Sequence, residues 1–499
     1  MRDPAVAERL AARDRWLDLL RGASIVFVVV GHWLVADLTY AQGELTLHSS
    51  LAEVSAMWPL TWVFQVIPVF FFVAGAVNGP AWQRCVDRGD GYASFVDRRV
   101  HRVWVPTVVM LVVVTGVALA LQAAGGGGVT GGGAMLLQPL WFLAVYLVLI
   151  AATPWTWRLY RRHGVRLFPA LLVLAVLADI ARVGLGLENV GLVNVVVVWL
   201  IVYLIGHAFA RGRLGRQAAT GLALAGSVVL VLLVTWGPYP PRMVGVPGDR
   251  LSNMHPPTLA VLALGCAQIG LLVLLRPWLT RRLEAPRVWA AVVWLNLSIM
   301  TLYLWHQVAM VAAARVLLAA GMPQPAPGEP GWWLMRGLWL VVAGGLLLGL
   351  VAVFGRFERR ASPPLAPTGT ASGLGAGVAV ALLVVGLLGL AGTRITEALD
   401  PQHPMGLGLS PFVAAVAVLL AGLVLHGVRR DGRSLARSLL VAVAVFAALA
   451  LGYRLIGGAG AVAVAQTCAA LAVLLVGATL AVLAVDRRGR TAARGPVSG

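Results

Sequence analysis

The stretch SIVFVVVGHWLVA, residues 24–36, contains no Asp, Glu, Lys or Arg and lies within an apolar run that starts near residue 17. Two later stretches, AVLALGCAQIGLLVLL at 260–275 and LVVAGGLLLGLVAVF at 340–354, have the same character. About 20 such residues are enough for a helix to cross a bilayer, and similar runs recur to the end of the chain. The sequence therefore predicts a polytopic membrane protein.

The composition of the 499 residues excludes an ordinary soluble globule. Hydrophobic residues make up 60% and charged residues 12%, whereas soluble domains carry about 25% charged residues. The net charge of +19 is compatible with nucleic-acid binding, but all 39 basic residues are arginines, most of them in short loops between apolar runs. We interpret these arginines as topology signals and expect no nucleic-acid partner.

The apolar segments are long, rich in Leu, Ala and Val, and do not alternate, so in lipid they must be helices. Fourteen are predicted, near residues 17–38, 57–79, 103–123, 138–156, 167–184, 190–210, 217–236, 256–275, 289–319, 332–355, 374–392, 409–428, 437–455 and 460–485. Arginines gather in alternate loops, as expected of cytoplasmic loops. The predicted fold is an all-α transmembrane helical bundle of about 14 helices with both termini cytoplasmic, residue 130 outside, and residues 90 and 365 inside.

A Pro/Ser/Thr/Gly-rich cytoplasmic linker at 358–373 divides the chain. It separates a ten-helix membrane domain, 1–357, from a four-helix membrane module with a basic cytoplasmic tail, 374–499. The last four helices contribute no deep His, Asp or Glu, so we expect them to lie outside the chemical centre. Of the outer loops, 123–134 is a glycine-rich flexible linker, whereas 236–258 contains prolines, aromatics and polar groups that can form an ordered cap.

The first helix carries ionisable groups that are costly inside a membrane. Arg21 and His32 are eleven positions apart, which is about three turns and 16.5 Å of rise, so they share one face. We expect Arg21 at the cytoplasmic rim and His32 deep in the membrane, an arrangement that suits a long anionic substrate. Asp18 shares that face and can orient the guanidinium or cap the helix start. The alternative is a packed neutral histidine and an arginine that only anchors the helix.

Two further groups of residues are candidates. Arg99 and Arg102, three apart before the third helix, can bind phosphate through their guanidinium groups or can act as topology signals only. In the ninth segment, Asn296, Tyr303 and His306 are predicted to share a stripe that faces the bundle interior, because their polar atoms need partners in lipid.

The three cysteines, Cys85, Cys266 and Cys468, are too few and too scattered for a disulfide framework. No CxxC motif or Cys/His cluster suggests a metal. We therefore expect unpaired thiols and no metal site.

Several motifs together resemble the membrane acyltransferase-3 family, whose members move acyl groups, often acetyl, onto cell-surface glycans. They are LDLLRGASIVFVVVGHW (17–33) with its Arg21-x10-His32 spacing, Arg99-x-x-Arg102, FFFVAGAVNG (70–79), LWFLAVYL (140–147) and LYLWH (302–306). The resemblance covers about residues 13–357. The sequence departs from the family at Ala74, where a serine is common, and in the last four helices, which lie outside the common core.

The resemblance implies that acyl-CoA, a co-substrate and not a permanently bound cofactor, enters from the cytoplasm. The acceptor hydroxyl, on a carbohydrate or glycolipid, enters from the outer side. In this scheme Arg21, Arg99 and Arg102 hold the CoA phosphates and His32 is the general base. Asp18, Asn296, Tyr303 and His306 line the cavity or orient these groups. The implied location is the cell membrane.

Two alternatives remain open. A transporter or flippase for a lipid-linked sugar also fits fourteen helices, although the halves of the chain show no clear symmetry. A purely structural membrane protein is disfavoured by the buried histidines.

Overall fold

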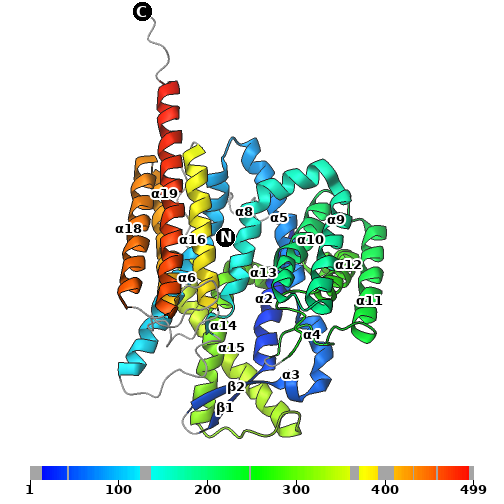
Figure 1. The fold of residues 1–499 in the computed structure, drawn as a ribbon. Helices are drawn as coiled ribbons and strands as arrows, with labels where there is room; N and C mark the ends of the chain where they lie inside the picture. Colours follow the sequence, from blue (N-terminus) through cyan, green and yellow to red (C-terminus); the bar gives the residue numbers. More distant parts are fainter. Residues whose placement is uncertain are drawn as a thin grey trace, which may run out of the picture. The chain divides into compact units, whose positions relative to one another are not determined.

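The computed structural model describes residues 14–41, 44–123, 136–246, 249–359, 370–391, 410–430, 432–456 and 459–493. Nearly all of them are helical (Figure 1). The elements of the first half are α2 (Arg15–Val35), β1 (Ala36–Ala41), β2 (Glu44–Ser49), α3 (Ser50–Glu53), α4 (Trp58–Phe64), α5 (Ile67–Asp87), α6 (Tyr92–Ala123), α8 (Leu140–His163), α9 (Leu167–Asp179), α10 (Val193–Ala210) and α11 (Arg216–Thr235). Those of the second half are α12 (Leu259–Arg282), α13 (Pro286–Leu297), α14 (Ile299–Ala319), α15 (Pro330–Arg359), α16 (Thr370–Ala391), α17 (Pro411–Arg430), α18 (Gly432–Ile456) and α19 (Ala459–Ala493).

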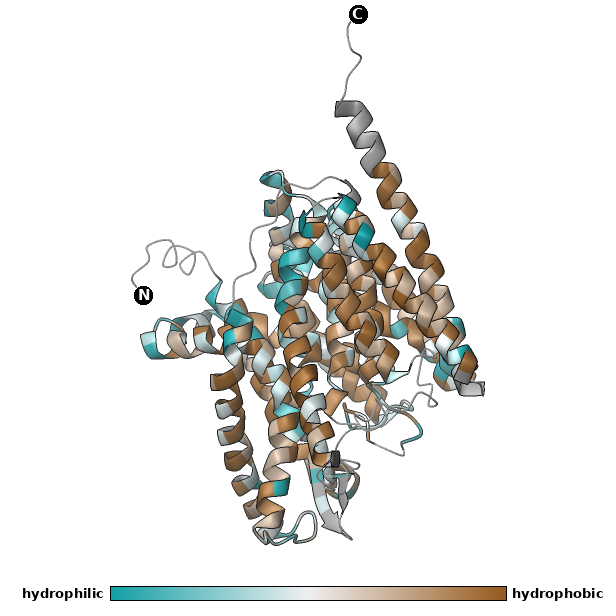
Figure 2. Ribbon diagram, turned by 90° about the vertical axis from the view of Figure 1, so that its left-hand side faces the viewer, coloured by the Kyte–Doolittle hydropathy of each residue, from teal (hydrophilic) through white to brown (hydrophobic). Residues whose placement is uncertain are grey.

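Thirteen helical runs in this part of the chain are long and apolar enough to cross a membrane, which confirms the all-α polytopic fold. One run, Leu140–Gly184, has 45 residues and contains two of the predicted segments. Gly164 separates them: its φ of +59° is readily adopted by glycine, and a 3₁₀ turn then leads into α9. Figure 2 shows hydrophobic residues along the helices and hydrophilic residues mainly at helix ends and in loops.

Two predicted segments are broken, which corrects the sequence analysis. The segment at 57–79 divides into α4 and α5 at Gln65 and Val66, and Pro68, which lacks an N–H, lies in the first turn of α5. The segment at 289–319 divides at Ser298, whose φ of −119° and ψ of 11° are not helical. Asn296 and Tyr303 therefore lie on different helices and do not share a stripe.

Other differences concern the connections. Strands β1 and β2 pair as a small two-stranded sheet directly after α2, where the sequence predicts no strand. Helices α15 and α16 enter the predicted linker 358–373 from both ends, to Arg359 and from Thr370. Residues 130 and 365, and the glycine-rich loop beyond residue 123, lie outside the described residues.

The contacts between residues group the chain into two compact units. The first takes in the described parts of Met1–Leu38, His48–Ala81 and Thr153–Gly355, and the second those of Thr39–Leu47, Trp82–Ala152 and Arg356–Gly499. Helix α6, which precedes the predicted linker, thus groups with the C-terminal helices. The division by contacts differs from the division suggested by linker composition.

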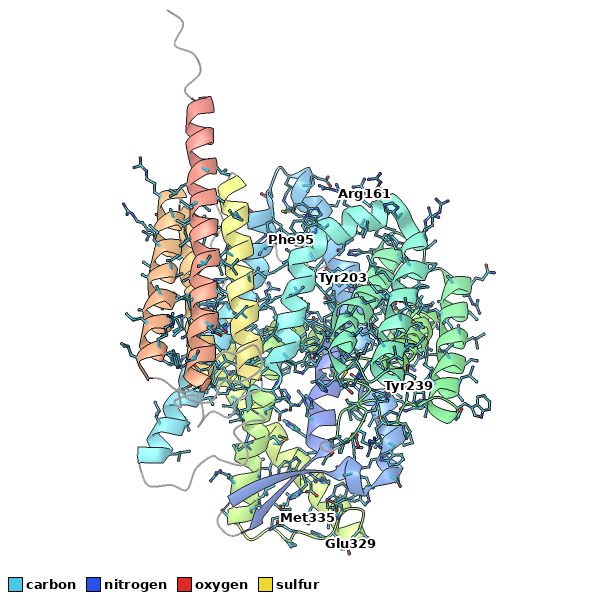
Figure 3. The ribbon with its side chains drawn as sticks, viewed as in Figure 1. Phe95, Arg161, Tyr203, Tyr239, Glu329 and Met335 are labelled. Carbon is cyan, nitrogen blue, oxygen red and sulfur yellow. The ribbon has the colours of Figure 1, made fainter. Side chains whose placement is uncertain are left out.

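Close helix crossings build the first unit. A Cβ on Gly75 of α5 would lie 2.0 Å from the carbonyl oxygen of Tyr203, and one on Gly206 of α10 would lie 2.2 Å from that of Phe72. Tyr203, labelled in Figure 3, is fully buried at this crossing. Small residues let the two backbones touch, as is common between membrane helices.

The described residues of the loop between α11 and α12 form the ordered cap that the sequence predicts. Asp179, buried at the end of α9, accepts hydrogen bonds from the Tyr239 hydroxyl at 2.9 Å and the Leu259 N–H at 2.8 Å (Tyr239 is labelled in Figure 3). Burial and the Asp179 charge raise the pKa of Tyr239, which keeps its hydroxyl a donor. Arg182, also buried, donates to the carbonyl oxygens of His255 and Pro256.

In the second unit, α16, α17, α18 and α19 pack together, and α6 packs against α16 and α17. Figure 1 shows α16, α18 and α19 side by side, from yellow to red. A Cβ on Gly386 of α16 would lie 2.6 Å from the Val418 side chain of α17. Cys266 lies in the first unit, and Cys85 and Cys468 lie in the second. All three are free thiols, as predicted.

Candidate active site

Two histidines from helices far apart in the chain meet in the first unit. His32 lies in the last turn of α2, and His306 lies in α14. The Nδ1 atom of His32 is 2.8 Å from the Nε2 atom of His306, and the two rings are nearly parallel, at 10°. The sequence predicts that these residues line one cavity; the structure places them in direct contact.

The hydrogen bonds of His306 fix the proton positions of both neutral rings. Its Nδ1 is within hydrogen-bonding distance of the Tyr303 carbonyl oxygen, which can only accept, so Nδ1 carries the proton. Nε2 of His306 must then accept from Nδ1–H of His32. This leaves Nε2 of His32 with a free lone pair, which is the form that a general base needs.

The two histidines differ in accessibility. His306 is 0% exposed, whereas His32 is exposed. The indole N–H of Trp33 donates to the His306 carbonyl oxygen at 3.0 Å and so ties α2 to α14 beside the ring pair. The His32 ring is therefore accessible, whereas the His306 ring is enclosed.

Tyr303 contributes its main-chain carbonyl to this arrangement. Its ring is buried, with its centroid 5.8 Å from that of His306. The sequence groups Tyr303 with Asn296, but Asn296 belongs to α13 and donates from Nδ2 to the carbonyl oxygens of Asp18 and Val292. Asn296 thus fastens α13 to the first turns of α2, away from the ring pair.

The start of α2 holds the other candidates. Asp14 caps the helix by accepting from the N–H groups of Trp16 and Leu17, so the alternative that Asp18 provides the cap is wrong. Arg21 is half-buried, and among the described residues its side chain has no hydrogen bond or ion pair. Its guanidinium is thus available to an anionic ligand.

Arg99 and Arg102 belong to the second unit, so their approach to Arg21 remains a prediction. Arg99 donates to the Phe95 carbonyl oxygen at 2.9 Å and lies 3.7 Å over the Phe95 ring, which Figure 3 labels near the start of α6. Arg102 is exposed. The neighbouring Arg98 is engaged elsewhere, 3.5 Å from Asp90 in the loop before α6.

A buried ion pair that is not predicted from the sequence lies directly after α2. Arg336 of α15 pairs with Asp37, donates to the Ala36 carbonyl oxygen, and lies over the rings of Trp332 and Trp339. These contacts anchor the chain five residues after His32. The available signal is an arginine inside a predicted membrane segment, a position where an ionisable group is costly and needs a partner.

His207 was also missed. It is fully buried in α10, with Nδ1 2.9 Å from the Gly75 carbonyl oxygen and Nε2 3.2 Å from the Thr156 hydroxyl. Both ring nitrogens are engaged, so this histidine fastens the crossing of α5 and α10.

Comparison with known proteins identifies the family of the first ten predicted helices. Residues 14–356, more than half of the chain, match the acyltransferase-3 family model, described as an acyltransferase domain. The match confirms the resemblance seen in the sequence, and the last four helices lie outside it. No curated protein and no solved structure shows a significant match. The chain therefore belongs to the acyltransferase-3 family and is a multi-pass membrane acyltransferase that transfers groups other than aminoacyl groups.

Proposed function

We propose that this protein moves an acyl group, most simply acetyl, from cytoplasmic acyl-CoA to a hydroxyl of an extracytoplasmic or lipid-linked glycan at the cell membrane. The observation that carries the proposal is the contact between His32 and His306. It supplies an accessible imidazole whose outer nitrogen is free to take a proton.

The proposed chemistry is direct transfer. Nε2 of His32 takes the proton of the acceptor hydroxyl while the hydroxyl oxygen attacks the thioester carbonyl carbon. The carbon–sulfur bond then breaks, and the leaving thiolate receives the proton from His32. The products are the acyl ester and free coenzyme A, and both rings are neutral again.

His306 assists by stabilising the charged intermediate state of His32. When His32 becomes an imidazolium, its Nδ1–H···Nε2 hydrogen bond to His306 becomes charge-assisted and therefore stronger. The Tyr303 carbonyl holds His306 in the tautomer that accepts this bond. The role resembles that of the third member of a catalytic triad, played here by a neutral ring.

Donor binding is assigned to the arginines. Arg21 is eleven residues before His32 on the same helix, about 16.5 Å along its axis. A guanidinium at that distance, with no hydrogen bond or ion pair to the described residues, suits the phosphates of a long, extended thioester donor. Arg99 and Arg102 are proposed to add to this phosphate site.

The direct test uses purified protein in nanodiscs, acetyl-CoA carrying a labelled acetyl group, and a glycan acceptor extracted from membranes. We expect acceptor-dependent formation of an ester and release of coenzyme A, both lost in His32→Ala. Arg216→Ala, an exposed arginine at the start of α11, is the matched control. Equal transfer by wild type and His32→Ala would overturn the mechanism.

Transport of a lipid-linked sugar is the second candidate. It is favoured by the helix breaks at Gln65–Val66 and Ser298, because transporters often bind substrate where helices are interrupted. A flippase activity would continue in His32→Ala, since translocation needs no proton acceptor there. Scrambling of a labelled lipid-linked sugar in liposomes separates the two activities.

A further inference from the structure

An ion pair buried in the second unit links α6 to α17. The Nε and Nη2 atoms of Arg429 lie 2.9 Å and 3.1 Å from the two carboxylate oxygens of Asp97. Asp97 is 0% exposed and Arg429 is 18% exposed. A bidentate guanidinium–carboxylate pair fixes orientation as well as distance.

A second contact lies seven residues after Asp97 on α6 and seven residues before Arg429 on α17. The indole N–H of Trp104 donates to the Val418 carbonyl oxygen at 2.8 Å. A Cβ on Gly422 would lie 2.0 Å from the Trp104 ring, so the ring lies directly against the α17 backbone. Because Asp97 precedes Trp104 while Arg429 follows Gly422, the two helices run antiparallel and touch at both points.

Asp97 and Trp104, which contact α17, lie on one face of α6, and Arg99 and Arg102 lie on another. At about 100° per residue, Asp97 and Trp104 lie within about 20° of each other around the helix axis. Arg99 and Arg102 lie within about 60° of each other, and their mean direction is about 180° from that of the first pair. The contacts of Asp97 and Trp104 with α17 therefore fix the rotation of α6 about its axis, and with it the direction in which Arg99 and Arg102 point.

We propose that Arg429 is a positioning residue for donor binding: through Asp97, the C-terminal helices hold α6 in the rotation that presents Arg99 and Arg102 to the donor phosphates. The inference rests on the proposed phosphate-binding role of those arginines. It gives a function to helices that the family match does not include. Loss of Arg429 leaves a buried carboxylate without its counter-charge and without its bidentate partner, so α6 is no longer held in one rotation: it can turn or shift toward water, or Asp97 can take up a proton.

The test is coenzyme A binding and acetyl transfer by the full chain in nanodiscs. Arg429→Gln is expected to weaken coenzyme A binding by about tenfold, the loss expected when one charge-assisted contact is weakened, with kcat at saturating donor changed less than about twofold. Arg429→Lys, which keeps the charge but not the bidentate geometry, should fall between wild type and Arg429→Gln. Arg430→Gln, an exposed neighbour, is the matched control and should bind as wild type does.

Non-additivity separates positioning from general destabilisation. In an Arg99→Ala/Arg102→Ala background, Arg429→Gln should add no further loss of binding. Adding Asp97→Asn to Arg429→Gln should restore part of the affinity, because the unpaired buried charge is gone. If Arg429→Gln does not fold, coenzyme A binding is compared for Arg429→Lys alone and in the Arg99→Ala/Arg102→Ala background. The proposal again expects a loss in the first case and no further loss in the second.

The pattern of coenzyme A affinities shows whether the positioning role of Arg429 or the donor site itself is wrong. Wild-type affinity in both Arg429 variants, with a clear loss in Arg99→Ala/Arg102→Ala, would overturn the positioning role alone. Wild-type affinity in Arg99→Ala/Arg102→Ala would overturn the donor site, and the inference with it. Equal losses in all backgrounds would make Arg429 a general structural residue and also overturn the proposal.

Discussion

The two ends of α2 differ in how the protein holds their ionisable side chains. Arg21, near the start, has no hydrogen bond or ion pair to the described residues, whereas His32, in the last turn, is held through a chain of two hydrogen bonds by His306 and Tyr303. A group that waits for a ligand can be left without a protein partner. A group that must take a proton at one defined atom needs its other atom fixed. The difference fits the proposed roles, donor binding at Arg21 and proton transfer at His32.

The largest expected effect comes from the end of α2 that is proposed to perform the chemistry. His32→Ala should lower turnover by about a hundredfold or more, the usual contribution of a positioned base, and leave coenzyme A affinity nearly unchanged. Acyl transfer and coenzyme A binding are measured on the same nanodisc preparation. Normal transfer would remove the general base from the mechanism, and a loss of affinity would make His32 a donor-binding residue.

Arg21→Ala should produce the complementary defect. It removes a charge-assisted contact worth roughly 1.5 to 3 kcal/mol, so coenzyme A should bind about ten- to a hundredfold more weakly. At saturating donor, kcat should remain close to that of wild type. If turnover falls while affinity stays constant, the contrast between the two ends of α2 is lost.

A third prediction concerns His306, the hydrogen-bond partner of His32 at the end of α2. His306→Ala should lower kcat by about tenfold, because His32 loses the partner that defines its tautomer and stabilises its charge. His306→Gln should retain part of this activity, since its amide oxygen can still accept a hydrogen bond from Nδ1 of His32. Thermal unfolding checks that the buried substitutions leave the fold intact. Equal rates for Ala, Gln and wild type would exclude His306 from the mechanism.

The smallest effect concerns the cap rather than either end of α2. Desolvation and the nearby Arg182 guanidinium lower the pKa of His255, so the folded protein disfavours its protonation. The unfolded chain then binds more protons as pH falls below the ordinary histidine pKa, and stability contributed above that pH is lost on acidification. The melting temperature should fall between pH 7 and pH 5, and less so in His255→Asn. An identical pH dependence in both proteins would exclude this group.

Much of the membrane architecture could be predicted because hydropathy depends on runs of residues. The breaks at Gln65–Val66 and Ser298 could not, since one or two polar residues barely change the hydropathy of a long segment. Pro68 was the available signal for the first break. The grouping of α6 with the C-terminal helices depends on contacts more than 300 residues apart in the chain, between Asp97 and Arg429.

The candidate site was predictable in its residue types and less so in its geometry. The spacing of Arg21 and His32 follows from one helix, and both residues indeed belong to α2. The contact of His32 with His306, 274 positions away, depends on how α2 packs against α14. From the sequence alone, truncation after Gly373 is expected to preserve coenzyme A binding; the buried Asp97 now argues that it weakens binding.

The spacing of contacts between α6 and α17 has a consequence for comparing genomes. Asp97 and Trp104 are seven positions apart, as are Gly422 and Arg429, so the pairing can be written as Asp-x6-Trp in the core and Gly-x6-Arg in the extension. The two signatures should be inherited together. In relatives that lack the last four helices, an aspartate at the position of Asp97 would have no arginine partner and would destabilise the fold. A neutral residue is expected there instead.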